Sequence, residues 1–294
     1  MLGKIDLFIA GAQKSGTTSL KNYLSEHPQI FGHIQTEFTY FIDNDEFAMG
    51  YEYVIKKYYR FKKRPQGIKL ISKSISLFTD EVAIQRLYSH NAGCQIVIML
   101  RNPVDRAYSS FNMEVYNGWK YSEFKLVKES IENPCKELEE LNLVTISLGI
   151  YIKYIQKLFK VFPKEQVHIF LFEDFIKTPT TICQKLFKLL NVDSDFIPDT
   201  HVVYNKTFIK KSGILASLLS RIKQKDNLIK KTTKSIIPYS TFTKITHKIK
   251  DINKSGKVHE PMSAEMRAYL LDFYKPYNED LSKLTGIDFS VWNS

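Results

Sequence analysis

The chain has 294 residues, of which 44% are hydrophobic and 25% are charged, a composition typical of globular proteins with one large or two small domains. It has no apolar run near the roughly 18–20 residues that span a bilayer, and the three cysteines Cys94, Cys135 and Cys183 are too scattered for a disulfide framework or a zinc site. The N-terminus lacks a basic-then-apolar signal pattern, so we expect a cytoplasmic protein without a transmembrane segment.

The net charge of +11 arises in one segment of the chain. Residues 206–257 contain 14 Lys or Arg side chains and two acidic ones, whereas the rest carries 28 basic and 29 acidic side chains. One interpretation is an ordinary solvated helical face. The other is a positive field that attracts an acidic glycan, a nucleotide or a membrane surface.

Strand-like runs alternate with helical patterns along the chain. Strands are predicted at 5–10, 68–71, 95–100 and 167–172. Helices are predicted at 17–27, 80–89, 103–115, 149–162, 180–190 and 263–284. Three of the strands are almost continuously apolar, as parallel strands covered on both faces are. The pattern predicts a single α/β domain over 1–294, with a central parallel sheet flanked by helices and a helical elaboration at about 206–257.

The segment GAQKSGTTSL, residues 11–20, follows the first predicted strand and opens the first predicted helix. Backbone N–H groups and the helix dipole favour an anion at such a position, and Thr17, Thr18 and Ser19 add hydroxyl donors. In a triphosphate-binding loop the lysine follows the second glycine, but here that place holds Thr17 and the lysine is Lys14. We predict an anion site; the alternative is a glycine turn that only joins strand to helix.

A second motif, RNPVDRAYSSF, follows the strand predicted at 95–100. Arg101 leaves the strand, Pro103 suits the first position of a helix, and Ser109 lies about two turns further on. A guanidinium and a hydroxyl group that converge can hold a second phosphate. A structural pair between Arg106 and an aspartate is an equally open interpretation.

Together the two motifs resemble those of the sulfotransferases that use 3′-phosphoadenosine 5′-phosphosulfate (PAPS). QKSGTTSL is similar to their 5′-phosphosulfate loop and RNPVDRAYSSF to their 3′-phosphate motif. TEFTYF and SKSISLF are similar to segments of the heparan-sulfate branch, and NKSGKVHEP with EDLSKLTGIDFSVW resembles the C-terminal nucleotide loop and closing helix. The resemblance covers almost the whole chain, is nearest to the carbohydrate-type and bacterial branch, and implies the P-loop sulfotransferase fold.

The resemblance implies which residues bind PAPS. The 5′-phosphosulfate would be held by Lys14, Ser15, Gly16, Thr17, Thr18 and Ser19, the 3′-phosphate by Arg101 and Ser109, and the nucleotide also by Gly256 and Lys257. Lys14 would stabilise the charge that grows on the oxygen bridging phosphorus and sulfur. The product would be adenosine 3′,5′-bisphosphate, and no metal is expected because the family uses none.

The implied reaction is in-line transfer of a sulfuryl group to a hydroxyl or amine, which calls for a general base. The heparan-sulfate branch uses a glutamate, and Glu37 matches its position. The small-molecule branch uses a histidine in a Lys-Thr-His context, where this chain has Lys73, Ser74 and Ile75. That difference favours Glu37 as the base, with Lys73 reaching both the sulfate and the base.

The acceptor implied by the resemblance is a glycan, and the basic segment favours an acidic one; a small molecule or lipid stays open. No nucleic acid partner is expected. Golgi members carry a membrane anchor and a cysteine pair that this sequence does not match, which weakens the case for heparan sulfate itself.

Two rival classes are a P-loop kinase or NTPase and a non-catalytic module for anionic polymers. The first would want Gly-Lys-[Ser/Thr] and an acidic Mg²⁺ ligand after a strand, whereas the strand at 95–100 ends in Arg101.

Overall fold

The computed structural model describes residues 3–59, 65–201 and 261–293. The basic segment, with Gly256 and Lys257, lies outside these ranges. The chain divides into two compact units: one comprises Met1–Arg106, Leu148–Asn205 and Leu270–Ser294, and the other Ala107–Ser147 and Lys206–Tyr269. A single domain over 1–294 stays a prediction.

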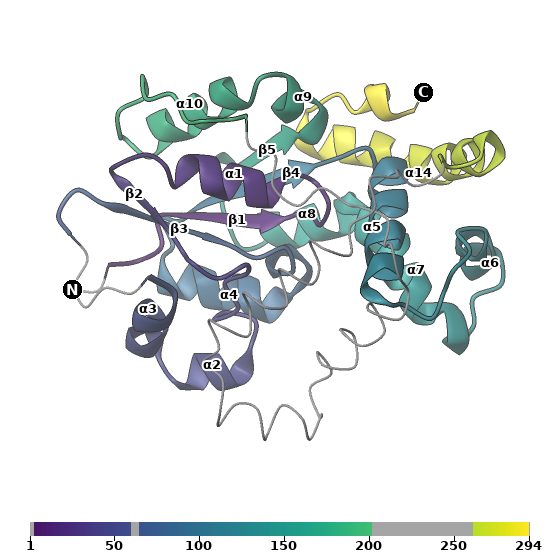
Figure 1. Ribbon diagram of the computed structural model, residues 1–294, viewed down its shortest axis with the longest axis horizontal. Coiled ribbons are helices and arrows are strands. Elements are labelled where there is room, and N and C mark those ends of the chain that lie inside the picture. Colours follow the sequence, from purple (N-terminus) through teal and green to yellow (C-terminus); the bar gives the residue numbers. More distant parts are fainter. Residues whose placement is uncertain (1–2, 60–64, 202–260, 294) are drawn as a thin grey trace. The chain divides into compact units, whose positions relative to one another are not determined.

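The first unit is built on a five-stranded sheet, which lies at the centre of Figure 1. The strands are β1 (Leu7–Gly11), β2 (Ile30–Gly32), β3 (Lys69–Lys73), β4 (Gln95–Leu100) and β5 (Val167–Leu171), in the order β2-β3-β1-β4-β5. Every neighbouring pair is parallel. The predicted parallel sheet is therefore confirmed, although β2, a strand of three residues, is not among the predicted strands.

Helices cover both faces of the sheet (Figure 1). One face packs against α1 (Thr17–Leu24), α9 (Phe172–Lys177) and α10 (Pro179–Leu189), and the other against α3 (Tyr51–Tyr59), α4 (Glu81–His90) and α8 (Tyr151–Phe159). Side chains alternate along β1, so Leu7 and Ile9 pack into the core beneath α1, α9 and α10, whereas Phe8 and Ala10 pack into the core beneath α3, α4 and α8. Burial on both faces explains why β1 and β4 are continuous apolar runs.

Most element boundaries differ from the sequence prediction by one to three residues, and two of the differences have a structural context. The first helix ends at Leu24 and not at His27, because the residue before a proline, here Pro28, is disfavoured in helical backbone. Phe172 begins α9 and is not the last residue of β5. The short α2 (Asn44–Ala48), which precedes α3, lies between predicted elements.

The second unit contains α6 (Leu126–Glu132) and α7 (Glu139–Thr145). The helix α5 (Pro103–Asn117) begins in the first unit and continues into the second, and α14 (Ala264–Thr285) begins in the second and ends in the first. The second unit packs its own aromatic rings together, namely Tyr108, Phe111, Trp119, Tyr121 and Phe124. Within the described ranges, no helix has the length and apolar content to cross a membrane.

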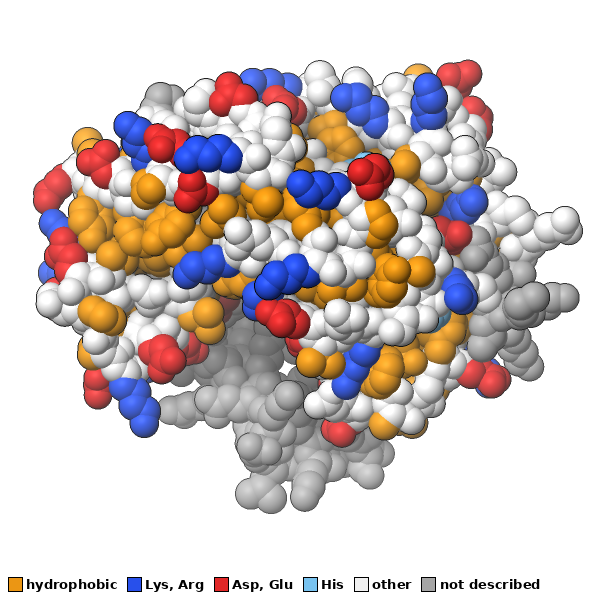
Figure 2. Space-filling view, turned by 180° about the vertical axis from the view of Figure 1, so that it is seen from behind, with side chains coloured by type: hydrophobic (Ala, Val, Ile, Leu, Met, Phe, Trp, Pro, Cys, Tyr) orange, Lys and Arg blue, Asp and Glu red, His pale blue; other side chains and the backbone are white. Residues whose placement is uncertain are grey.

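The charges on the face shown in Figure 2 are mixed. Lys and Arg side chains lie among Asp and Glu side chains, with bands of apolar side chains between them. Interspersed charges of both signs create little long-range field. This agrees with the near balance of basic and acidic residues outside 206–257.

Candidate active site

The loop between β1 and α1 leaves the carboxyl end of a central strand. Ala12 donates its backbone N–H to the Met99 carbonyl at 2.8 Å, which ties the loop to β4. Lys14 and Gly16 have φ values of 67° and 77°, both in the left-handed region. Left-handed residues within a tight loop are typical of backbone concavities that bind anions.

The loop and the first turn of α1 fit an anionic group. No side chain of the described residues caps α1, and its first turn holds no acidic residue, so the positive end of the helix is not neutralised there. Ser15 Oγ is buried and has no hydrogen-bond partner in the described part of the chain. Buried polar atoms are normally paired, and an oxygen of a phosphosulfate on this loop would supply the missing partner.

Gly16 meets two requirements at once. Besides its φ of 77°, a Cβ atom added there would lie 3.1 Å from the Phe172 ring and 3.3 Å from the Phe175 ring. We expect Gly16→Ala to lower the free energy of unfolding by about 2–3 kcal/mol, roughly 1 kcal/mol from the backbone and the rest from crowding.

The matched control is Gly50→Ala, because Gly50 has a φ of 79° but no atom within 4 Å of the added Cβ. Only the backbone cost of about 1 kcal/mol applies there. Urea unfolding of the wild type and both variants measures the difference, and equal losses at the two glycines would contradict the packing requirement.

Arg101 follows β4 and lies beside the same loop. Its Nη1 donates to the Lys14 carbonyl at 3.2 Å, and its Cζ lies 4.9 Å from the centroid of the Phe172 ring. Burial lowers the pKa of Arg101, while Asp105 and other acidic neighbours oppose this, and a guanidinium stays charged throughout. The two motifs meet because β1 and β4 are neighbours where the strand order reverses, the usual ligand position in open α/β sheets.

A polar cluster fixes the backbone around Arg101. Glu173 accepts the Asn102 backbone N–H at 2.8 Å and the Trp292 indole N–H at 3.4 Å. Tyr151 donates its hydroxyl to the Arg101 carbonyl at 2.8 Å. Residues far apart in the sequence therefore hold the end of β4 in place.

Ser109, the predicted partner of Arg101, lies on the part of α5 that belongs to the second unit. It is half-buried there, and its role stays a prediction. Gly256 and Lys257 are outside the described ranges, so their predicted contacts with the nucleotide also stay predictions.

Lys73, at the end of β3, lies between the first turn of α1 and Glu37. Its Nζ donates to Thr18 Oγ1 at 3.3 Å and forms an ion pair with Glu37 Oε1. The other carboxylate oxygen, Oε2, accepts the Ile75 backbone N–H at 3.0 Å. The Lys73 side chain is 1% exposed and that of Glu37 is 28% exposed, so solvent reaches the carboxylate but not the ammonium. These three predicted residues thus form one cluster.

The main chain of Lys73 also holds the segment that carries Glu37. Its N–H donates to His33 Nε2 at 3.1 Å, and its carbonyl accepts the Phe38 N–H at 2.8 Å. His33 accepts this bond as a neutral imidazole, because burial and the charges of Lys21 and Lys73 keep its pKa well below the ordinary value. The segment 33–38 is therefore attached to β3 on both sides of Glu37.

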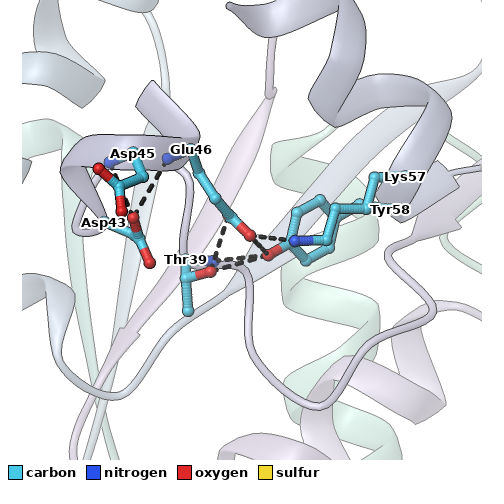
Figure 3. A network of polar contacts seen from close by, with 6 residues as sticks. All are labelled: Thr39, Asp43, Asp45, Glu46, Lys57 and Tyr58. Carbon is cyan, nitrogen blue, oxygen red and sulfur yellow. Dashed lines mark hydrogen bonds and ion pairs between the residues drawn. The ribbon is translucent and has the colours of Figure 1, made fainter. Parts of the chain in front are cut away.

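A second network fixes the chain just beyond Glu37, and Figure 3 shows it from close by. Thr39 Oγ1 donates to Glu46 Oε2 at 2.9 Å and lies 2.8 Å from the Tyr58 hydroxyl, which also contacts Glu46 Oε2 at 2.9 Å. Lys57 completes the network through an ion pair with Glu46. Glu46 on α2 thereby joins the Glu37 segment to α3.

Three residues near the site are absent from the sequence prediction: Lys21, His33 and Glu173. Lys21 is buried in α1, and its Nζ donates to the His33 carbonyl at 2.9 Å. Lys21 lies four residues after Thr17 and so shares its face of α1. This spacing is the sequence signal that could have placed Lys21 near the site. Glu173 and His33 offer no comparable local signal, because their partners come from other elements.

A left-handed loop before an uncapped helix at the switch point of a parallel sheet, with Lys73 and Arg101 at the strand ends on either side, is typical of P-loop α/β proteins. The sequence matches the family model for the sulfotransferase domain over residues 4–235. The chain therefore belongs to the sulfotransferase family and is a sulfotransferase enzyme, which confirms the predicted family.

Similar proteins act in glycan sulfation according to their names. Heparan sulfate glucosamine 3-O-sulfotransferase 5 of Mus musculus is 28% identical over 95% of this chain and 71% of its own length. Bifunctional heparan sulfate N-deacetylase/N-sulfotransferase 3 of Mus musculus is 26% identical over 94% of this chain and 29% of its own length. The crystal structure of a sulfotransferase from Alicyclobacillus acidocaldarius superposes with a TM-score of 0.68 at 22% identity, covering 99% of this chain and all of the other, and it shares the fold.

Proposed function

We propose that this sulfotransferase moves the sulfuryl group of PAPS to a hydroxyl or amine of a glycan, with Glu37 as the general base. The observation that carries the proposal is the Lys73 ammonium group, which bonds both Thr18 at the anion loop and the Glu37 carboxylate. A group bound on the loop and a proton acceptor are thereby close to one cation. In-line transfer with proton removal needs that proximity.

Each residue of the cluster has a separate task in this proposal. PAPS bound on the loop would supply the activated sulfuryl group and a stable leaving group. Ser15 and the backbone N–H groups of the loop would bind the 5′-phosphosulfate. Lys14 would stabilise the negative charge that develops on the leaving oxygen. Glu37 would take the proton from the attacking group of the acceptor, while Lys73 and Ile75 hold its carboxylate in place.

The predicted 3′-phosphate contacts can be tested on Arg101 and Ser109 together. We expect the double variant Arg101→Ala, Ser109→Ala to bind adenosine 3′,5′-bisphosphate about 10–100-fold more weakly, because charge-assisted hydrogen bonds contribute roughly 1.5–3 kcal/mol. Binding of adenosine 5′-monophosphate should change much less. Calorimetry with both nucleotides measures this, with Lys153→Ala, an exposed residue of α8, as the control. A double variant that keeps the full preference for the 3′-phosphate would contradict the assignment.

The glycan acceptor is supported by the names of the relatives, which specify heparan sulfate. An acidic glycan is also favoured by the 14 basic side chains of 206–257, since a positive field concentrates anionic substrates. The direct experiment is transfer from radiolabelled PAPS to a panel of one acidic glycan, one neutral glycan, one phenol and one glycolipid. We expect label in the acidic glycan, with a rate that falls as salt rises.

Binding of PAPS, measured with and without Mg²⁺, tests the donor. PAPS should bind without Mg²⁺, and ATP with or without Mg²⁺ should not compete. Label in the phenol or glycolipid alone would replace the glycan by a small-molecule or lipid acceptor. Absence of PAPS binding would reject the proposed donor.

A further inference from the structure

Lys21 is a buried lysine to which the proposed reaction gives no task. It lies in α1, four residues after Thr17, and is 9% exposed. Its Nζ donates to the His33 carbonyl at 2.9 Å. Lysines on surface helices usually extend the ammonium group into water. An ammonium group turned inward onto an uncharged carbonyl costs solvation energy, so this placement needs a compensating role.

In the described part of the chain, the ionisable groups that face Lys21 are the proposed catalytic pair and the neighbouring His33. They are Lys73 from β3, and Glu37 and His33 from the segment after β2. Burial, together with the charge of Lys73, lowers the pKa of Lys21 to about 8, although Glu37 opposes both effects. His33 contributes no charge, because burial and the two lysines keep its pKa well below the ordinary value. The cluster therefore contains two basic side chains and one acidic side chain.

This charge balance has a geometric consequence. Like charges repel strongly where little water separates them. Because the His33 carbonyl fixes the Lys21 ammonium group, the repulsion acts on Lys73 and favours its contacts with Glu37 and Thr18. The same Lys21 bond restrains the chain at His33, four residues before Glu37.

We propose that Lys21 is a positioning residue for sulfuryl transfer, whose charged ammonium group restrains the His33 end of the Glu37 segment and directs Lys73 onto Glu37 and Thr18. This inference rests on the proposed function, because Lys21 acts through the Glu37–Lys73 pair. It assigns to α1 a second task besides anion binding: alignment of the proton acceptor with the loop.

The test compares Lys21→Met, which keeps the length of the side chain, with Lys21→Arg, which keeps the charge at every accessible pH. We expect Lys21→Met to lower kcat about 10–100-fold at pH 7, the effect of a small misplacement of reacting groups, with little change in the KM for PAPS. The wild-type kcat should fall as the pH rises through about 8, where Lys21 loses its proton. Lys21→Met should lack this transition, and Lys21→Arg should stay active at higher pH.

Stability gives a readout that does not depend on turnover. The pKa of Lys21 is about 8 in the folded protein and 10.5 ordinarily, so between these values the unfolded chain binds more protons than the folded one. The free energy of unfolding of the wild type should therefore rise with pH in this range relative to Lys21→Met. This comparison remains informative if Lys21→Arg does not fold, and a pH-independent difference would overturn the inference.

The outcomes separate this inference from the function on which it rests. If Lys21→Met has the kcat and the pH profile of the wild type while Glu37→Gln is inactive, Lys21 has no positioning role and the proposed function stands. If Glu37→Gln turns over normally, the assignment of the base fails, and the role of Lys21 fails with it.

Discussion

Glu37→Gln is expected to lower the rate of sulfuryl transfer by about 10²-fold or more while leaving the affinity for adenosine 3′,5′-bisphosphate unchanged. The amide has the shape of the carboxylate but does not take a proton from the acceptor. Its oxygen can still accept the Ile75 N–H, which is bonded to Glu37 Oε2 at 3.0 Å in the wild type. The segment should therefore keep its place, so a lost rate would report lost chemistry.

Initial rates with PAPS and calorimetry with the bisphosphate product measure the two quantities. Glu52→Gln serves as the control, because Glu52 is 68% exposed on α3 and pairs only with Lys56 among the residues described; we expect no change in either quantity. Normal turnover by Glu37→Gln would show that another group removes the proton. Loss of both turnover and nucleotide affinity would indicate a disturbed fold instead.

Lys14→Met is expected to lower kcat by about 10²–10³-fold, the usual effect of removing one charge-stabilising donor from a transition state. Methionine retains most of the side-chain volume, and both residues are unbranched at Cβ, so the left-handed backbone at φ 67° costs the two side chains about the same. The Lys14 carbonyl also keeps its bond from Arg101, at 3.2 Å. The loop should therefore persist without its charge.

Single-turnover rates at saturating PAPS separate this effect from weaker binding. Lys185→Met, which removes an exposed ammonium group from α10, is the matched control and should leave the rate unchanged. A Lys14→Met enzyme with a normal single-turnover rate and only a raised KM for PAPS would make Lys14 a binding residue without a role in bond cleavage.

The main features of the fold follow from local sequence patterns. β1 and β4 are recognisable because burial on both faces makes them continuously apolar, and β5 because four of its five residues are apolar. Arg101 reaches the loop after β1 because β1 and β4 are neighbouring parallel strands. β2 could not be predicted in this way, since its three residues contain only two apolar side chains, and Phe31 is 40% exposed. A strand this short is specified by its pairing with β3 and not by its own pattern.

Less of the candidate site than of the fold could be predicted from the residues alone. The roles of Glu37 and Lys73 depended on the resemblance to a family, because no local rule brings together two side chains 36 residues apart. Lys21 was missed because lysine on a helix is normally assigned to the solvated face. Glu173 was missed for another reason: its partners Asn102 and Trp292 are separated by 190 residues and meet only in the folded chain.

Residues 33–38 are attached to β3 through the main chain of Lys73. The position of this segment therefore does not depend on the side chain of residue 73. Neither the N–H nor the carbonyl of residue 73 depends on which side chain stands there. The side chains at 37 and 73 can therefore be exchanged while these two backbone hydrogen bonds are kept. Substitutions at these two positions should therefore change the chemistry proposed for the site without displacing the segment that carries residue 37.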